Sequence, residues 1–510
     1  MEKPNIVLIV MDAVRAQNVS LYGYERETTP NLKEISRRCA VYKNTISTSY
    51  WTFPSYASTF TGTYVSKHGL VIAGDVLDNN FVTIAEMLRR YGYKTIGVCP
   101  SPFVSKLSGL HRGFEIFVDP FYTGFQSKMY NFVNKILPQA REKVMRTAPK
   151  KDFLRRERFL TPQSESFRRQ GALKRVRGLT KRGFWTFTGL FDKYARATNN
   201  QAFKLIERVK RQPFFLFIHY NETHTPYILP NSYRKKFLRS VPEKRPWDVN
   251  QDFFEHYSGG AKIRELDSRV MIALYDGAIN YLDARIFEIY SFLSKKELLD
   301  NTMLIITSDH GDGFGEHGIR FHFFCLYDFL IRVPLIIKYP INLGFCGVEN
   351  RIVQNVDILP TIMDVLRIDD RKLLNQIQGN SLVSSNISKR DHSYAISELV
   401  EPFGLRMQIL REKLKKYDRQ LISIRTENKK YIYTTDGNHE FYDLENDPGE
   451  TNNLIDSKSP IIEELREKLK PWLPAFHHYC RKIQSKNSRE RERTEFETEI
   501  RQRLKNLGYL

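Results

Sequence analysis

The order of apolar and polar positions predicts alternating strands and helices over much of the chain. Apolar runs of strand length occur at residues 6–11, 214–220, 302–308 and 333–338. They are apolar at odd and even positions alike, which is typical of strands buried on both faces of a parallel sheet. Helical spacing occurs at residues 31–42, before a strand within 81–100, and at 267–296. This alternation predicts an α/β fold with a large, mixed but mostly parallel sheet flanked by helices.

Three regions depart from this alternation. Residues of about 125–200 are basic and poor in strand patterning, which predicts a helical insertion within a main domain of residues 1–385. Strand-like and turn-rich sequence over residues 386–480 predicts a smaller α+β subdomain. Residues 481–510 are densely charged and predict an amphipathic helical tail. Its apolar positions are Phe496, Ile500, Leu504 and Leu507.

The composition is that of a globular protein with a strongly basic segment. The 510 residues are 41% hydrophobic and 13% aromatic, and the net charge is +21. Residues 141–190 hold 15 Lys or Arg against four acidic residues, so this segment is either a solvated surface or an attractor of anions. No zinc-finger, RNP or helix-turn-helix pattern accompanies it, which disfavours nucleic acid. An anionic ester substrate or peripheral contact with an anionic membrane is the better expectation.

Cysteine usage and hydropathy predict a cytoplasmic protein. The five cysteines are scattered and odd in number, which indicates neither a disulfide framework nor a CxxC metal site. The apolar run at residues 6–11 is shorter than a signal-peptide core, and no run approaches the roughly 20 apolar residues of a membrane span.

Polar residues directly after the apolar runs are candidates for a functional site, because ligands bind beyond the carboxyl ends of parallel strands. Taken singly, each also has a structural explanation, such as a helix cap for the first aspartate or a turn for the threonine in WTFPSY. The candidates are Asp12, Thr52, His224, Asp309 and His310.

The strongest local signal is SDHGDGFGEHG at residues 308–318. It combines two Asp, a Glu, two His and four Gly after a strand, and glycine lets a backbone turn sharply around a ligand. The adjacent Asp309 and His310 offer one oxygen and one nitrogen ligand, which suits a divalent cation. His322 lies 13 residues beyond Asp309 and is either part of the site or a partly buried histidine in an aromatic stretch.

Nine segments in order carry a family resemblance. They are NIVLIVMDAVRAQNVSLYGY, TPNLKEIS, WTFPSYASTFTGTYVSKHG, FLFIHYNETHTPY, LYDGAINYLD, SDHGDGFGEHG, IRVPLIIKYP, NVDILPTIMDVL and FYDLENDPGETNNL. Together they resemble the sulfatase family of the alkaline phosphatase superfamily. The resemblance implies an alkaline-phosphatase-like sandwich, in which residues 1–385 are the catalytic domain.

The resemblance also implies roles for particular residues. It implies a shell for a divalent cation, whether Mn, Zn, Mg or Ca, formed by four residues, namely Asp12, Thr52, Asp309 and His310. It implies that Thr52 is the nucleophile and that His224 and His322 bind the transferred group or handle the leaving-group proton. The 13-residue step from Asp309 to His322 matches phosphoethanolamine-transferring relatives.

Three positions depart from the typical sulfatase pattern. Ala13 replaces a second aspartate, Tyr56 replaces the signature arginine that supports the nucleophile, and Thr52 replaces the Cys or Ser that is converted to formylglycine. Formylglycine hydrate expels sulfate by collapsing to an aldehyde, which requires two hydroxyls on one carbon. Threonine has one hydroxyl, so a covalent intermediate on it must be broken by a second attack on phosphorus or sulfur.

These observations favour a metal-dependent hydrolase or transferase of phosphate mono- or diesters that acts through a covalent Thr52 intermediate. Sulfuric ester hydrolysis on a sulfated glycan or small molecule is the alternative that the motif order favours. A catalytically inactive polyanion-binding protein is the alternative outside enzymes. Charge on the substrate could be offset by Lys67, His68 and Arg320, or these could be exposed loop residues.

Overall fold

A computed structural model gives the structure of the chain. It describes residues 3–72, 74–120, 192–239, 241, 249, 251, 256–259, 265–383, 393–403 and 410–487. Most of the predicted basic insertion therefore lies outside the described residues, as does the predicted tail from residue 488 onward.

An eight-stranded sheet forms the centre of the molecule, in the order β4-β3-β5-β1-β6-β7-β2-β8. The strands are β1 (Asn5–Met11), β2 (Ala40–Ile46), β3 (Lys94–Val98), β4 (Ile116–Val118), β5 (Phe214–Tyr220), β6 (Thr302–Ser308), β7 (Arg332–Lys338) and β8 (Gly347–Gln354). Only β7 among them runs antiparallel to its neighbours, while the other pairs are parallel. The predicted mixed, mostly parallel sheet is confirmed.

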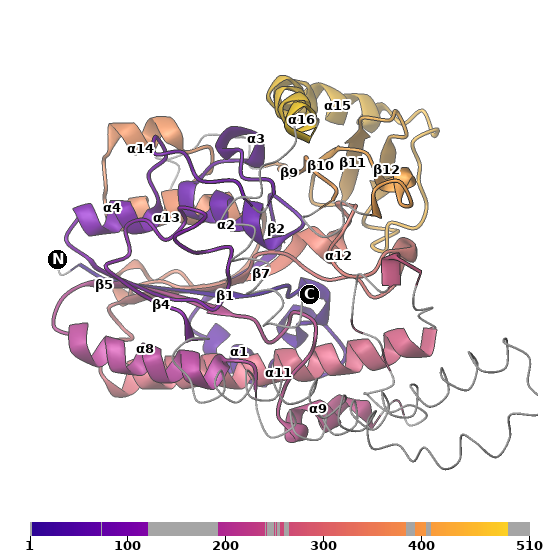
Figure 1. Cartoon of the computed structure of the whole chain (residues 1–510). Coiled ribbons are helices and arrows are strands. Elements are labelled where there is room, and N and C mark those ends of the chain that lie inside the picture. Colours follow the sequence, from indigo (N-terminus) through magenta and orange to yellow (C-terminus); the bar gives the residue numbers. More distant parts are fainter. Residues whose placement is uncertain are drawn as a thin grey trace, which may run out of the picture.

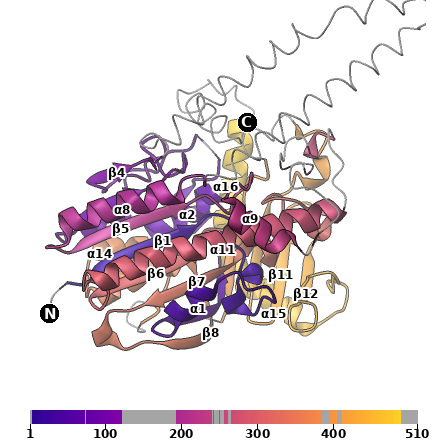
Figure 2. The same cartoon turned by 90° about the horizontal axis from the view of Figure 1, so that it is seen from below.

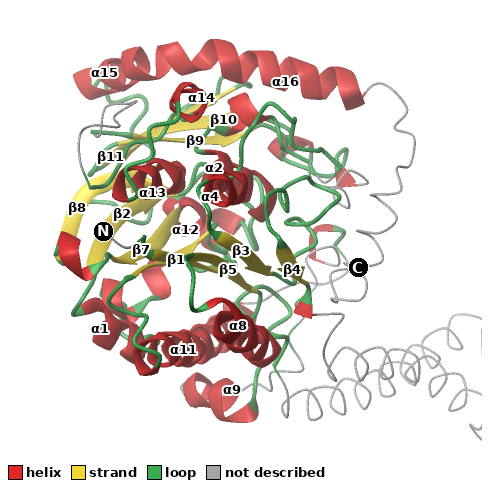
Figure 3. Cartoon of the chain, turned by 90° about the vertical axis from the view of Figure 1, so that its left-hand side faces the viewer, coloured by secondary structure: helices red, strands yellow, loops and turns green. Residues whose placement is uncertain are grey.

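Helices cover both faces of this sheet (Figures 1 and 3). One face carries α1 (Pro30–Ser36), α8 (Ala195–Val209), α9 (Asn231–Leu238) and α11 (Glu265–Lys295). Figure 2 shows α8 and α11 lying along the strands on this face. The other face carries α2 (Thr52–Thr61), α4 (Ile84–Arg90), α13 (Ile358–Val365) and α14 (Arg371–Gln376).

The alternation of side chains along a strand explains why the central strands are apolar throughout. On β1, Val7 and Ile9 belong to the core beneath α11, whereas Leu8 belongs to the core beneath α2. On β5, Phe217 packs in the core beneath α2. Since side chains two residues apart share a face, His219 also faces α2.

One element prediction is wrong at its C-terminal half. The helix predicted over residues 31–42 ends at Ser36, and strand β2 begins at Ala40. Residues 40–46 contain β-branched and aromatic residues, which favour strands, and they pair with both β7 and β8. Pairing with distant strands determines the structure of this segment, and the helical spacing of apolar residues gives no information about that pairing.

A second, four-stranded antiparallel sheet lies in the predicted C-terminal α+β region, in the order β12-β11-β10-β9. Its strands are β9 (Ala395–Leu399), β10 (Leu421–Arg425), β11 (Lys429–Thr434) and β12 (Glu440–Asp443). Helices α15 (Pro460–Leu469) and α16 (Leu473–Asn487) lie beside this sheet (Figure 1). Helix α16 crosses residue 480, where the predicted subdomain ends and the predicted tail begins. No helix among the described residues is long and apolar enough to span a bilayer.

The second sheet supports the segment that leads into α2. Ser397 Oγ donates to the Ser47 carbonyl at 2.6 Å, and the Glu398 N–H donates to the Thr48 carbonyl at 2.9 Å. In return, Ser49 Oγ donates to the Glu398 carbonyl at 3.0 Å. These bonds fix residues 47–49, and α2 begins three residues later at Thr52.

A buried ion cluster fastens the same sheet to the segment before β7. Lys430 on β11 is fully buried, and its ammonium donates to Asp328 Oδ1 at 2.5 Å and to Glu450 Oε1 at 2.6 Å. Arg425 on β10 donates to both carboxylate oxygens of Asp328. Asp328 begins α12 (Asp328–Ile331), which follows the glycine-rich loop after β6. The cluster thus restrains the far end of that loop.

Replacing Lys430 by methionine should lower the free energy of unfolding by about 3–5 kcal/mol, because Asp328 and Glu450 would lose a buried partner. Lys429→Met is the matched control, since the Lys429–Asp443 pair is partly exposed and should be worth no more than about 1 kcal/mol. Chemical denaturation measures both values. Equal losses in the two variants would contradict the role of the cluster.

Candidate active site

The carboxyl ends of β1, β5 and β6 meet at one edge of the main sheet. Met11 pairs with Ser308 and with Tyr220, so the residues that follow these strands emerge side by side. Asp12 follows β1, and its N–H donates to the Tyr220 carbonyl at 2.9 Å. Asp309 follows β6 directly. Strand pairing thus brings together carboxylates that are nearly 300 residues apart in the sequence, as predicted.

Four predicted metal-site residues lie around one point. Ligand atoms of Asp12, Asp309 and His310 are all within 4.8 Å of one another. Measured from His310 Nε2, Thr52 Oγ1 lies at 3.1 Å, Asp12 Oδ1 at 3.5 Å and Asp309 Oδ2 at 3.6 Å. Atoms that bind one divalent ion at about 2.0–2.4 Å lie within about 4.8 Å of each other. The spacing therefore fits a single cation.

The hydrogen bonding of these residues also fits a cation. Asp12 Oδ1 and Asp309 Oδ2 are buried and have no hydrogen-bond partner among the described residues. Buried carboxylate oxygens are normally paired or bound to metal. His310 Nδ1 pairs with the Gly311 carbonyl at 2.7 Å, so Nδ1 carries the proton and Nε2 has a lone pair toward the cluster. Two oxygens and one nitrogen thus remain to hold a divalent ion.

Burial and mutual repulsion act on the two carboxylates. Burial raises the pKa of Asp309, and the negative charge of Asp12 adds to this rise. Burial also raises the pKa of Asp12, but the neighbouring imidazoles, His219 first among them, outweigh burial and hold that pKa below its ordinary value. A cation between the two aspartates would remove the repulsion that destabilises the doubly charged pair.

Thr52 is the first residue of α2 and is almost fully buried. The N–H groups of the first helical turn lack partners within the helix, and the helix dipole places partial positive charge there. An oxyanion on Thr52 is stabilised in this position by ~0.3–2 kcal/mol. The structure thus places the hydroxyl at a helix N-terminus beside the metal-ligand cluster, as a nucleophile requires.

Two further predicted residues complete the site. The ring centroid of His322 lies 4.6 Å from that of His310 and 4.9 Å from that of His224. His322 Nδ1 lies 3.4 Å from Asp312 Oδ1, and His224 Nδ1 pairs with the Thr225 carbonyl at 2.7 Å. Burial lowers the pKa of His224 well below its ordinary value. The Nδ1 atom of each imidazole is thus held by an oxygen of the protein.

The loop that carries His224 is held by residues that sequence reasoning missed. Lys193 is buried, and its ammonium donates to the carbonyls of Asn221, at 3.0 Å, and of His224. Glu222 Oε1 accepts two backbone N–H groups at the start of α8, at 2.8 and 2.6 Å. Burial lowers the pKa of Lys193 to about 8 despite the nearby charge of Glu222. These contacts set the position of His224 beside the cluster.

Two more residues lie beneath the cluster, namely His219, which sequence reasoning missed, and Tyr56, which it named only as a departure from the family signature. His219 is fully buried on β5, and its Nε2 lies 3.5 Å from Asp12 Oδ2. Its Nδ1 forms a short hydrogen bond with the hydroxyl of Tyr56, one helical turn after Thr52. A signal was present, because His219 is the polar exception in the apolar run FFLFIHY and lies near its carboxyl end.

The predicted substrate-binding residues Lys67 and Arg320 make structural contacts elsewhere. The Lys67 ammonium donates to the Gln376 carbonyl at 2.5 Å. Arg320 is buried, not an exposed loop residue, and its guanidinium donates to the Phe314 carbonyl at 2.8 Å. Neither contact involves the metal-ligand cluster. Their predicted role in binding substrate charge finds no support in this geometry.

His68 is likewise buried and not exposed. Its Nε2 lies 3.1 Å from Ser58 Oγ, and its Nδ1 accepts the Leu70 N–H at 3.1 Å. Burial lowers the pKa of this imidazole to about 3. A neutral ring that binds α2 through Ser58 stabilises the helix that carries Thr52, and it supplies no positive charge for an anion.

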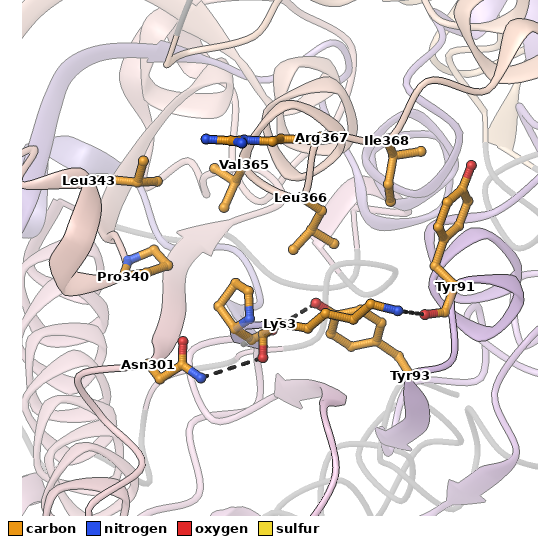
Figure 4. A pocket seen from close by; sticks show the side chains of 11 residues that line it. Lys3, Tyr91, Tyr93, Asn301, Pro340, Leu343, Val365, Leu366, Arg367 and Ile368 are labelled. Atoms are coloured by element: carbon orange, nitrogen blue, oxygen red, sulfur yellow. Dashed lines mark hydrogen bonds between the residues drawn. The ribbon is translucent and has the colours of Figure 1, made fainter. Parts of the chain in front are cut away.

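A separate pocket of about 330 Å³ lies at the opposite, amino-terminal edge of the sheet (Figure 4). Its lining residues precede β1, β3 and β6, follow β7, or lie at and just after the end of α13, namely Lys3, Pro4, Tyr91, Tyr93, Asn301, Pro340, Leu343, Val365, Leu366, Arg367 and Ile368. None of the clustered catalytic candidates belongs to it. The cluster beyond the carboxyl ends therefore remains the candidate active site.

Comparison with known proteins decides the family. A family model described as Sulfatase matches residues 4–368, which include every residue of the cluster. The chain belongs to the sulfatase family. A second model, described as the C-terminal part of N-sulphoglucosamine sulphohydrolase, matches residues 315–475 of this chain.

Its curated relatives include enzymes for different esters. Choline-sulfatase of Rhizobium meliloti is 24% identical over 503 residues, covering 91% of this chain and 84% of the relative. The multifunctional alkaline phosphatase superfamily protein PehA of Trinickia caryophylli is 23% identical over 522 residues, covering 92% and 95%.

Solved structures show the same fold over nearly the whole chain. A phosphonate monoester hydrolase of Agrobacterium radiobacter matches with a TM-score of 0.61 and 18% identity, covering 94% of this chain and 96% of that chain. A protein solved with its substrate D-glucosamine-2-N,6-O-disulfate matches with a TM-score of 0.66 and 18% identity, covering 94% and 99%. The chain has the alkaline-phosphatase-like fold and is a hydrolase, and its family generally holds a divalent metal.

Elemental analysis of the purified protein should find one divalent ion per chain. Asp309→Asn should remove most of it, because the buried ligand set would lose one of two carboxylates. His317→Ala, in the same loop but outside the cluster, should retain the metal. Full metal content in Asp309→Asn, or equal loss in His317→Ala, would contradict the assignment of the ligands.

Proposed function

We propose that this sulfatase-family protein hydrolyses or transfers phosphate esters, with Thr52 as a direct covalent nucleophile and a divalent cation in the Asp12, Asp309 and His310 cluster. One observation carries the proposal. A threonine, which cannot become formylglycine, lies at a helix N-terminus with its hydroxyl 3.1 Å from a candidate metal ligand. The metal, when bound, supplies Lewis acidity that favours the alkoxide form of the hydroxyl.

The chemistry of threonine favours phosphorus over sulfur. A Thr52 ester cannot release its group by collapse to an aldehyde, because its β-carbon carries one oxygen. The group must leave through a second in-line attack on its central atom. Phosphorus accepts such an attack readily through a loose transition state whose charge a cation and hydrogen-bond donors stabilise.

His322 is the better general acid of the two histidines. Asp312 Oδ1 lies behind its Nδ1 at 3.4 Å, and a carboxylate in that position holds the ring in one orientation, with Nε2 toward the substrate. The lowered pKa of His224 makes that ring neutral, so its Nε2 is suited to accept a hydrogen bond. Because a carboxylate lies behind the His322 ring and the His224 ring is neutral, we assign proton transfer to His322. His224 then orients the substrate or the acceptor.

The reaction then has two balanced steps. Thr52 Oγ1, having released its proton to solvent, forms a bond to phosphorus as the bond from phosphorus to the leaving oxygen breaks, and His322 Nε2 gives that oxygen a proton. Water or an acceptor alcohol next attacks the same phosphorus, passes its proton to His322, and displaces Thr52 Oγ1. Water as the acceptor gives hydrolysis, and an alcohol gives transfer.

Sulfuric ester hydrolysis is the second candidate. The sulfatase names among the relatives and the protein solved with a disulfated glucosamine favour it. Thr52 and Tyr56, in place of the convertible residue and the signature arginine, disfavour it. A binding role without turnover is less well supported, since binding alone needs no hydroxyl beside the metal ligands. All three readings share an anionic ester as ligand.

Thr52→Ala should lower kcat for phosphate esters by about 10⁴-fold or more, because the attacking oxygen is removed. Thr52→Ser keeps a hydroxyl and should retain substantial activity. Rates with para-nitrophenyl phosphate, its bis-ester and para-nitrophenyl sulfate measure the effect and rank the substrates. Full activity of Thr52→Ala would refute the nucleophile, and faster turnover of the sulfate ester would favour the second candidate.

His322→Ala should lower kcat/KM for an alkyl phosphate by about 10²- to 10⁴-fold. The loss should be much smaller for para-nitrophenyl phosphate, because nitrophenolate leaves without a proton. His224→Ala should affect both esters alike, since orientation does not depend on the leaving group. The same loss for both esters in His322→Ala would contradict its role as general acid.

A further inference from the structure

In two of the candidate ligands, Asp309 and His310, one donor atom faces the cluster and the other is held by backbone groups. Asp309 Oδ1 accepts the N–H groups of Ala13, at 3.1 Å, and of His310, at 2.9 Å, which leaves Oδ2 toward the cluster. His310 Nδ1 donates to the Gly311 carbonyl. Both residues are therefore oriented by backbone groups, and no side-chain substitution would remove those partners.

Asp12 differs from the other two because its second atom faces a side chain. Asp12 Oδ1 points to the cluster and has no hydrogen-bond partner among the described residues, while Oδ2 lies 3.5 Å from His219 Nε2. His219 is fully buried on β5, on the face of the sheet that α2 covers. The orientation of Asp12 thus depends on which way the His219 ring presents its proton.

Tyr56 determines the tautomer of His219, that is, which of its ring nitrogens carries the proton. Its hydroxyl pairs with His219 Nδ1, which is the sole hydrogen-bond partner of this phenol within the described residues. Burial raises the pKa of Tyr56 well above its ordinary value, so the phenol keeps its proton. A buried hydroxyl with one possible acceptor donates to it. His219 Nδ1 therefore accepts, and the ring proton is on Nε2, directed at Asp12 Oδ2.

We propose that Tyr56 and His219 form a positioning pair that holds Asp12 Oδ2 and thereby aims Asp12 Oδ1 at the cation. The proposal rests on the metal site described above. Partners of this kind fix the geometry of a ligand, and their loss typically weakens metal binding by about 10- to 100-fold. In this chain, Tyr56 stands where the family signature has an arginine, and it acts on a metal ligand through His219.

Calorimetric titration of the metal-free protein with Mn²⁺ tests the pair without any activity assay. His219→Leu should bind Mn²⁺ about 10- to 100-fold more weakly than the unaltered chain. Tyr56→Phe should also bind more weakly, because the ring is then free to place its proton on Nδ1. His219→Gln should recover much of the affinity lost in His219→Leu, since its amide N–H can reach Asp12 Oδ2.

Tyr42→Phe is the matched control for Tyr56→Phe. Tyr42 is equally buried, and its hydroxyl pairs with the hydroxyl of Tyr339 at 2.8 Å, away from the cluster. It should keep unaltered affinity for Mn²⁺, and thermal unfolding without metal should show that each variant folds.

Three results would overturn the positioning pair. They are unaltered affinity in His219→Leu, no gain of His219→Gln over His219→Leu, and equal losses in the two tyrosine variants. A crystal structure of the Mn²⁺ complex with His219 Nε2 bound to the metal would also overturn it, because Nε2 would then carry no proton. If the unaltered chain binds no Mn²⁺, the metal site itself is refuted together with the pair.

Discussion

Two carboxylates buried side by side at one edge of the sheet form the constraint on which the rest of the site depends. Asp12 and Asp309 are almost fully buried, and each keeps one oxygen without a hydrogen bond among the described residues. Such a pair is costly to fold without a compensating charge. The neighbouring polar groups face Asp12 Oδ2 and Asp309 Oδ1. The other oxygen of each carboxylate is left for a cation.

The topology of the sheet creates this pair. Parallel pairing of β1 with β6 places Met11 opposite Ser308, so the next residue of each strand is an aspartate at the same edge. The second sheet then fixes two segments that carry site residues beside this edge. It binds residues 47–49 before Thr52, and its buried Lys430 cluster restrains the segment that follows His322. Parts of the chain distant in sequence thus hold Thr52 and His322 at set positions.

Sequence patterns predicted the central strands β5 and β6 at their observed bounds, because long apolar runs are buried on both faces. They also singled out Asp12, Thr52, Asp309 and His310 as separate candidates, since ligands gather beyond the carboxyl ends of parallel strands, and the family resemblance grouped these four residues as one metal shell. Strand β2 was missed because its identity depends on pairing with distant strands. The burial of His68 and Arg320 was not predicted, because local sequence does not show whether a polar side chain is buried against distant parts of the chain. His219 and Tyr56 required the three-dimensional contact between β5 and α2.

The central claim is that Thr52 itself takes up the phosphoryl group. The most direct measurement is rapid acid quench of the enzyme during turnover of para-nitrophenyl phosphate, followed by mass spectrometry of the intact chain and of its peptides. The expected result is one phosphoryl group per chain, located on Thr52 and lost when substrate is exhausted. A phosphoryl group on another residue, or turnover with no adduct under conditions where its formation outpaces its breakdown, would contradict the claim.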